Sequence, residues 1–209
     1  MAGTITALEI QKKNKERVNV YLDEKYAFAV TVLVAAELRK GQYLSDAEIE
    51  RLKDQDERNK AYNRAIFYLG FRARSRVEIE NYLRGKGYPA EVIAETIERL
   101  ARENYLDDQA FAEAWVGERE QFKPKSSKAL RYELRQKGVD EAAIETALND
   151  LDEDDLAWRA LEGKLRQWRQ LDEPDFKKKA LAFLGRRGFD YHVARNAVER
   201  AWRSLTSDE

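Results

Sequence analysis

The chain has 209 residues, of which 43% are hydrophobic and 37% charged, and its 38 basic and 39 acidic side chains leave a net charge of −1. This balance excludes a mostly disordered chain, and it excludes the strongly basic field that many nucleic-acid-binding proteins carry. The absence of cysteine excludes disulfides and thiolate metal sites, and the longest apolar run, residues 27–36, is too short to span a bilayer, so we expect a cytoplasmic protein without a membrane partner.

Residues 5–10 and 17–23 alternate between apolar and polar side chains with a period of two, and residues 26–30 are apolar and aromatic. This is the pattern of strands that bury one face, and it is clearest at Val18 and Val20. A polar turn around Asn14 and a second turn at 23–25 divide the segment. We therefore predict a small antiparallel sheet of three strands.

After the third strand the pattern becomes helical. A first short helix is expected to end at Gly41, and a second to begin at Ser45, which forms a capping box with Glu48 three residues later. Residues 54–60 are wholly polar. They are either a hinge or the exposed start of the next helix.

From residue 60 onward the sequence repeats itself three times. Gly87, Gly138 and Gly188 each follow a similar segment, at intervals of 51 (138 − 87) and 50 (188 − 138) residues. Apolar residues on both sides of these glycines recur in the same register, on one helical stripe per segment. A glycine at this place suits the left-handed residue that ends a helix.

Each repeat is predicted to contain three helices, of which the second ends at the repeated glycine. The expected first helices span residues 61–71, 108–122 and 156–171. We predict a mainly α protein in which three tandem three-helix repeats form an elongated curved array, preceded by a small N-terminal three-stranded antiparallel β-sheet with short helices. The expected boundaries are 1–55 for the N-terminal section and 56–106, 107–152 and 153–209 for the repeats.

The sequence contains no recognisable catalytic constellation, so we predict that the protein is not an enzyme and uses no cofactor. Its only histidine is His192, which has no evident nucleophile or metal-ligand partner. The acidic residues at 150–155 fit a solvated connector with negative charge at a helix start better than a metal site.

Basic residues recur in one part of every repeat, around the two ends of its second helix. Stacked repeats would align them along one side, which predicts a binding surface in a neutral chain. Cations at helix ends such as Arg84 and Lys86 also fit the helix dipole, but the dipole does not explain the cluster from Arg119 to Lys128. The candidate residues for binding a partner or DNA are Arg72, Arg74, Arg76, Arg84, Lys86, Arg119, Lys123, Lys125, Lys128, Arg131, Arg135, Lys137, Arg186 and Arg187.

Residues 104–116, Asn-Tyr-Leu-Asp-Asp-Gln-Ala-Phe-Ala-Glu-Ala-Trp-Val, resemble a signature of the RecX family, the regulators of the RecA recombinase. Residues 74–88 and 125–139 are similar to two further blocks of that family. Arg74 stands where the family often has an aromatic residue, and Asn104 where glycine is usual.

The resemblance implies a regulatory protein that binds the RecA–DNA filament. Such a protein inhibits or modulates the recombinase, ATPase and co-protease activities of RecA in DNA repair and the SOS response. Single- or double-stranded DNA is a further expected partner, and we expect a monomer. The main alternative is a DNA-binding helical-repeat protein that acts independently of RecA, which steeply salt-dependent binding to naked DNA would favour. A helical scaffold for an unrelated complex is another alternative.

Overall fold

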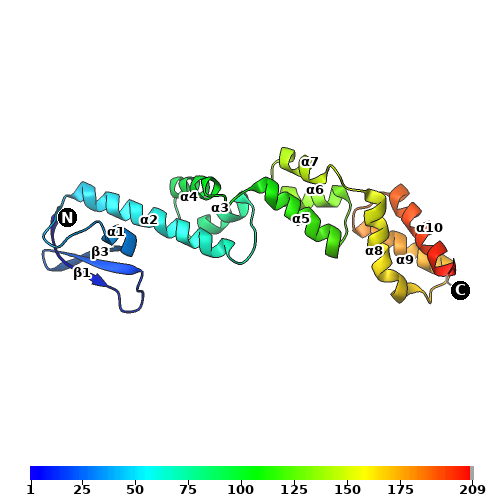
Figure 1. Cartoon of the computed structure of the whole chain (residues 1–209), viewed down its shortest axis with the longest axis horizontal. Helices are drawn as coiled ribbons and strands as arrows, with labels where there is room; N and C mark the ends of the chain where they lie inside the picture. The colour runs from blue at the N-terminus through cyan, green and yellow to red at the C-terminus, as the bar shows by residue number, and fades with distance from the viewer. Residues whose placement is uncertain (208–209) are drawn as a thin grey trace. The chain divides into compact units, whose positions relative to one another are not determined.

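The computed structural model describes residues 1–207, and Figure 1 shows the order of its helices and strands. The described chain divides into two compact units. The first unit contains Met1–Ala73 and Ile79–Leu106, and the second contains the other described residues. Among the described residues, no helix is both long enough and apolar enough to cross a membrane.

The N-terminal segment folds into an antiparallel sheet in the strand order β3-β2-β1-β4. Its strands are β1 (Gly3–Ile10), β2 (Arg17–Leu22), β3 (Lys25–Thr31) and β4 (Tyr43–Leu44). The three predicted strands are confirmed, but the predicted strand count is wrong by one. The fourth strand has only two residues, which is too short to show a period of two in the sequence.

Helices α1 (Val32–Ala35) and α2 (Asp46–Leu69) follow the sheet, and α2 is one continuous helix of 24 residues. Its capping box at Ser45 is confirmed. The polar stretch 54–60 is neither a hinge nor a helix start, because it lies in the middle of α2 and contains no glycine or proline. The boundary predicted between residues 55 and 56 therefore falls inside a helix.

The predicted three-helix repeats are confirmed. The first consists of the C-terminal part of α2 with α3 (Arg76–Arg84) and α4 (Ala90–Arg102). The second consists of α5 (Asp108–Phe122), α6 (Ser127–Gln136) and α7 (Glu141–Leu148). The third consists of α8 (Glu153–Trp168), α9 (Glu173–Arg186) and α10 (Tyr191–Ser207).

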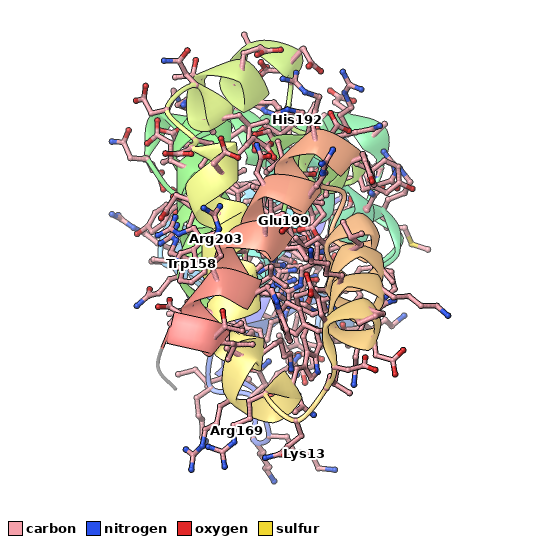
Figure 2. The ribbon with its side chains drawn as sticks, turned by 90° about the vertical axis from the view of Figure 1, so that its right-hand side faces the viewer. Lys13, Trp158, Arg169, His192, Glu199 and Arg203 are labelled. Atoms are coloured by element: carbon pink, nitrogen blue, oxygen red, sulfur yellow. The ribbon has the colours of Figure 1, made fainter. Side chains whose placement is uncertain are left out.

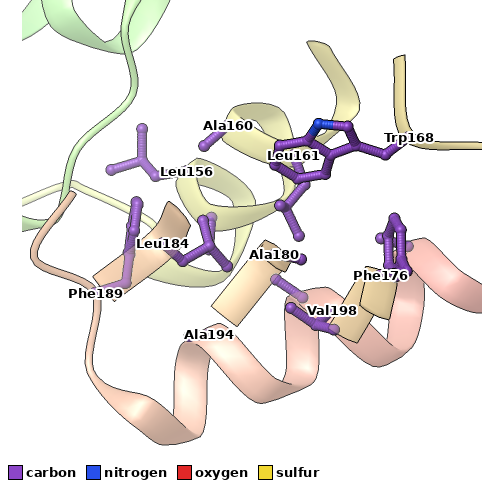
Figure 3. Close-up of a cluster of buried hydrophobic side chains, with 13 residues drawn as sticks. Leu156, Ala160, Leu161, Trp168, Phe176, Ala180, Leu184, Phe189, Ala194 and Val198 are labelled. Atoms are coloured by element: carbon purple, nitrogen blue, oxygen red, sulfur yellow. The ribbon is translucent and has the colours of Figure 1, made fainter. Parts of the chain in front are cut away.

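Each repeat has its own apolar core, and Figure 3 shows the core of the third repeat. There Phe176 packs against the indoles of Trp168 and Trp202, with ring centroids 6.3 and 5.4 Å away. Leu156 and Leu161 of α8 belong to the same core. Because every repeat buries its own apolar stripe, most polar side chains of its helices remain on the surface.

The repeated glycines all adopt the left-handed conformation that the sequence predicts, with φ of 85° at Gly87, 75° at Gly138 and 89° at Gly188. Within the second unit, two of them also allow close packing. A Cβ atom at Gly138 would lie 2.4 Å from Val77 Cγ2, and one at Gly188 would lie 2.6 Å from Ser126 Oγ. A Cβ at Gly87 would meet no atom within 4 Å.

Candidate partner-binding surface

Helix α6 lines a groove of about 740 Å³ in the second unit, facing the turn between α9 and α10. Leu130 and Leu134 are fully buried and fix the inner face of α6. The outer face therefore carries Lys128, Arg131 and Arg135, at a spacing of three to four residues. The groove is lined by Lys125, Lys128, Ala129, Arg131, Tyr132, Glu133, Arg135, Gly185, Gly188, Phe189 and Asp190.

Two of the lining arginines are already neutralised by carboxylates of α7. Arg131 binds both Glu141 and Glu145, and Arg135 binds Glu141 at 2.9 Å. These partners raise the pKa of Arg131 further above its ordinary value. A partner that binds the groove must therefore compete with fixed carboxylates at this end.

Lys125 and Arg119, two of the predicted binding residues, are held by Glu133. Glu133 binds Lys125 and Arg119, the latter at 3.2 Å, and it accepts a hydrogen bond from Trp115 Nε1 at 2.9 Å. The Arg119 guanidinium also lies 4.0 Å from the centroid of the Trp115 ring. All three ionic side chains are mostly buried, with 19 to 24% of each exposed. Their first role is to join α5 to α6.

The pKa of Glu133 lies below the ordinary value for glutamate. Burial raises this pKa, but the hydrogen bonds from Lys125 and Trp115 and the charges of Lys125 and Arg119 outweigh it. A lowered pKa in the folded state stabilises the fold at pH values above the unfolded-state pKa, which is about 4.3 for glutamate. This contribution is lost as the pH falls through the folded-state pKa.

A Glu133→Gln variant tests this contribution. Above about pH 5 we expect the variant to melt at a lower temperature than the wild type, because its amide cannot neutralise Lys125 and Arg119. As the pH falls below about 4, the wild-type carboxylate also becomes neutral, and the difference in melting temperature should shrink. Thermal unfolding followed by fluorescence across this pH range measures the difference. A difference that does not change with pH would contradict the assignment.

Lys128 and Lys123 remain open to a partner. Both are exposed, and neither forms an ion pair with any residue in the described part of the chain. Lys123 directly follows Phe122, whose ring is 74% exposed. Tyr132, one turn along α6 from Lys128, is 66% exposed and lines the same groove. Exposed rings beside open cations are typical of a surface that binds a partner.

Two further predicted residues, Lys137 and Arg187, bind other segments of the second unit. Lys137 Nζ binds Glu78 Oε1 at 2.8 Å. The side chain of Arg187 donates to the Pro124 carbonyl at 2.7 Å, and its burial lowers its pKa. Lys137 and Arg187 therefore hold the fold together, while Arg186, in the last turn of α9, is exposed.

Arg74 and Arg76 flank Ser75 at the start of α3, in the part of that helix that belongs to the second unit. Arg74 is half-buried, whereas Arg76 is exposed and its backbone N–H donates to Asp108 Oδ1 at 2.8 Å. Asp108 therefore binds the backbone at the start of α3. The residue that caps α5 is Asp107.

Arg72, Arg84 and Lys86 belong to the first unit. Arg72 donates to a neighbouring backbone carbonyl at 2.8 Å, and Arg84 donates to Asn81 Oδ1 at 2.6 Å. Lys86 Nζ lies 5.6 Å from the centroid of the Tyr82 ring. All three side chains are exposed. These local contacts leave their charged groups accessible to solvent.

Sequence reasoning missed Tyr132 and the arginines of α10, which are Arg195, Arg200 and Arg203. The sequence does contain a signal for these arginines. The third helix of the first two repeats carries more acidic than basic residues, whereas the third helix of the last repeat carries more basic than acidic ones. The acidic run at 150–155 has a structural role, because Asp152 accepts hydrogen bonds from the Asp154 and Asp155 amides and caps α8. Among the described residues, no group of three or more histidine or acidic side chains could hold a metal ion.

Comparison with known protein families finds four matches in chain order. Residues 3–45 match the regulatory protein RecX N-terminal domain. Residues 61–100, 107–148 and 152–198 match the first, second and third three-helix domains of RecX.

Similar proteins and solved structures agree with these matches. Regulatory protein RecX of Bacillus subtilis (strain 168) is 39% identical over 201 residues, which cover 94% of this chain and 76% of that protein. Regulatory protein RecX of Listeria monocytogenes serotype 4b (strain F2365) is 32% identical, with 96% and 77% covered. A crystal structure of regulatory protein RecX aligns with a TM-score of 0.71 at 31% identity, over 92% of this chain and 97% of that one. RecX from Lactobacillus salivarius shares the fold, with a TM-score of 0.61 at 24% identity over 70% of this chain and 97% of that one.

Proposed function

The chain belongs to the RecX family of regulatory proteins, and from this premise we propose that it binds the RecA–DNA filament as a monomer and inhibits or modulates the recombinase, ATPase and co-protease activities of RecA. The observation that carries the proposal is the presence of all four family domains in order. The protein acts by docking and performs no chemistry of its own. We place it in the cytoplasm, where RecA works in DNA repair and the SOS response.

The open part of the α6 groove supports a docking role. Lys128 and Tyr132 line the groove, and Lys123 is an exposed cation outside its lining. Neither lysine forms an ion pair within the described chain. Arg119 and Lys125 already neutralise Glu133, so they contribute to the surface mainly by shaping it. The unpaired cations should increase the rate at which an acidic partner associates, and this increase should diminish as the salt concentration rises.

The experiment measures DNA-dependent ATP hydrolysis by RecA on preformed filaments while the full chain is added. A parallel titration follows binding of the chain to the same DNA without RecA. We expect hydrolysis to change at concentrations far below those that saturate naked DNA. A change that appears only once naked DNA is saturated would favour the alternative, a DNA-binding repeat protein that acts without RecA.

A double variant, Lys123→Glu with Lys128→Glu, tests the surface. We expect it to need about ten times more protein for the same effect on hydrolysis, because two open cations become anions. The matched control is Lys12→Glu with Lys13→Glu, two exposed lysines in the turn between β1 and β2, with the same change in charge. Equal effects of the two double variants would remove the groove from the interface.

A further inference from the structure

The third helix of the last repeat has the opposite charge from the third helices of the other two repeats. Helix α4 carries three carboxylates and two arginines, and α7 carries two carboxylates and no cation. Helix α10 carries three arginines and a single carboxylate. Because the three helices are otherwise equivalent elements of the repeat, this change is not required by the fold.

Two arginines of α10, Arg200 and Arg203, line a groove of about 520 Å³ beside α8. Asn196, Arg200 and Arg203 repeat at intervals of four and three residues, which places them on one face of the helix. The lining residues are Asp154, Asn196, Ala197, Arg200 and Arg203. Figure 2 shows this end of the second unit, with Trp158 on α8 and with Arg203 and Glu199 on α10.

Arg200 is held in place by stacking and not by a carboxylate. Its guanidinium carbon lies 4.1 Å from the centroid of the Trp158 ring. Neither Arg200 nor Arg195 forms an ion pair with a described residue, and Glu199, the nearby carboxylate, binds Lys177 at 2.8 Å. A guanidinium stacked on an indole is pre-oriented and weakly hydrated, and its N–H groups remain available to an anion.

We infer that the groove between α8 and α10 binds the phosphodiester backbone of DNA. Arginine and asparagine donors on one helical face are the groups that contact phosphates. Of the five lining residues only Ala197 is apolar. A groove that received a protein would be expected to offer a large apolar anchor. The single opposing charge in the groove is Asp154.

This site goes beyond the proposed function, because a regulator of RecA can dock on the protein filament without touching DNA. It also differs from the α6 groove, in which the cations are largely bound to carboxylates and the exposed ring is Tyr132. Two surfaces on the second unit therefore have different chemistry. The α6 groove suits a protein partner, and the α8–α10 groove suits phosphates.

The experiment measures binding of the full chain to fluorescently labelled single-stranded and duplex oligonucleotides by anisotropy, over a range of salt concentrations. The test variant is Arg200→Gln with Arg203→Gln, the two arginines that line the groove. The control is Arg166→Gln with Arg169→Gln, two exposed arginines near the end of α8 that form no ion pair with described residues and do not line the groove. The two double variants have the same net charge.

We expect the test variant to bind DNA about 10- to 60-fold more weakly at 0.1 M salt, as follows from losing two phosphate contacts. The slope of log K against log salt should fall in magnitude by about 1.8 for duplex and about 1.4 for single-stranded DNA. The control should keep the wild-type affinity and slope. If the double variant folds poorly, as judged by its melting temperature, Arg203→Gln alone should lower the slope by about half as much.

Unchanged DNA binding by the test variant, or an equal loss in the control, would overturn the inference. So would a variant that keeps its DNA affinity but loses its effect on RecA, because the groove would then contact protein. Loss of DNA affinity with an unchanged effect on RecA hydrolysis supports the inference and leaves the proposed function standing. The two proposals can therefore fail separately.

Discussion

Replacing Asp56 with alanine is expected to lower the free energy of unfolding of the first unit by about 3–5 kcal/mol, the usual effect of breaking a buried ion pair from one side. Asp56 lies in α2 and is only 2% exposed. Its two carboxylate oxygens accept from Arg17 Nη1 at 2.9 and 2.8 Å, and one of them accepts from the Thr31 backbone N–H at 2.6 Å. Lys60 Nζ adds a second cation at 2.5 Å.

The variant removes a hydrogen-bond acceptor from two groups inside the unit. Arg17 would keep only its hydrogen bond to the Ala29 carbonyl, at 2.6 Å, and its charge would stay mostly buried. The Thr31 amide would lose its acceptor at the point where β3 ends. Both losses act on the contact between α2 and the sheet, so the sheet should open before the rest of the unit.

Hydrogen–deuterium exchange measures this opening directly, because all four tryptophans lie in the second unit and do not report on the sheet. Peptides covering residues 17–31 should lose protection in Asp56→Ala, while peptides of α8 to α10 keep theirs. The control is Asp54→Ala, an exposed acidic residue of the same helix, for which we expect a change within about 0.5 kcal/mol. Equal protection in both variants would show that the Asp56 pair does not hold the sheet.

The same residue shows where sequence reasoning reaches its limit. Local signals predict the caps and stops of the helices well, because Ser45, Asp140 and the glycines act through bonds to residues three or four positions away. Asp56 lies in a stretch that looks solvent-exposed. Its partner Arg17 is 39 residues distant, so no local pattern reveals that this carboxylate is buried.

The candidate surface was predictable in part for a related reason. The recurrence of basic residues points to this segment of the chain, and in the structure Lys125, Lys128 and Arg131 line one groove. The sequence does not reveal which cations are already bound, because Glu133 and Glu141 reach them across helices. The sequence predicts a cluster of basic residues, but the number of cations without an ion-pair partner depends on contacts between helices in the folded structure.

Replacing Gly138 with alanine is expected to lower the free energy of unfolding by about 2–5 kcal/mol. The left-handed φ of 75° costs an alanine about 1–2 kcal/mol. The new Cβ would also lie 2.4 Å from Val77 Cγ2, and such overpacking costs about 1–3 kcal/mol more. Urea unfolding followed by far-ultraviolet circular dichroism measures this change and also suits a control in the first unit, because helices of both units contribute to the signal, whereas all four tryptophans lie in the second unit.

Gly87→Ala is the matched control, because Gly87 has a similar φ of 85° but no atom within 4 Å of its added Cβ. We expect it to cost only the backbone strain, about 1–2 kcal/mol. Val77→Ala should partly rescue Gly138→Ala, because it removes the two Cγ atoms that the new methyl group meets, and this coupling identifies the contact. If Gly87→Ala and Gly138→Ala cost the same, the start of α3 does not pack on the Gly138 turn, and the glycines serve only to end their helices. A larger cost at Gly138 means that the same glycine both ends α6 and leaves room for Val77 at the start of α3, so a change there destabilises two elements at once.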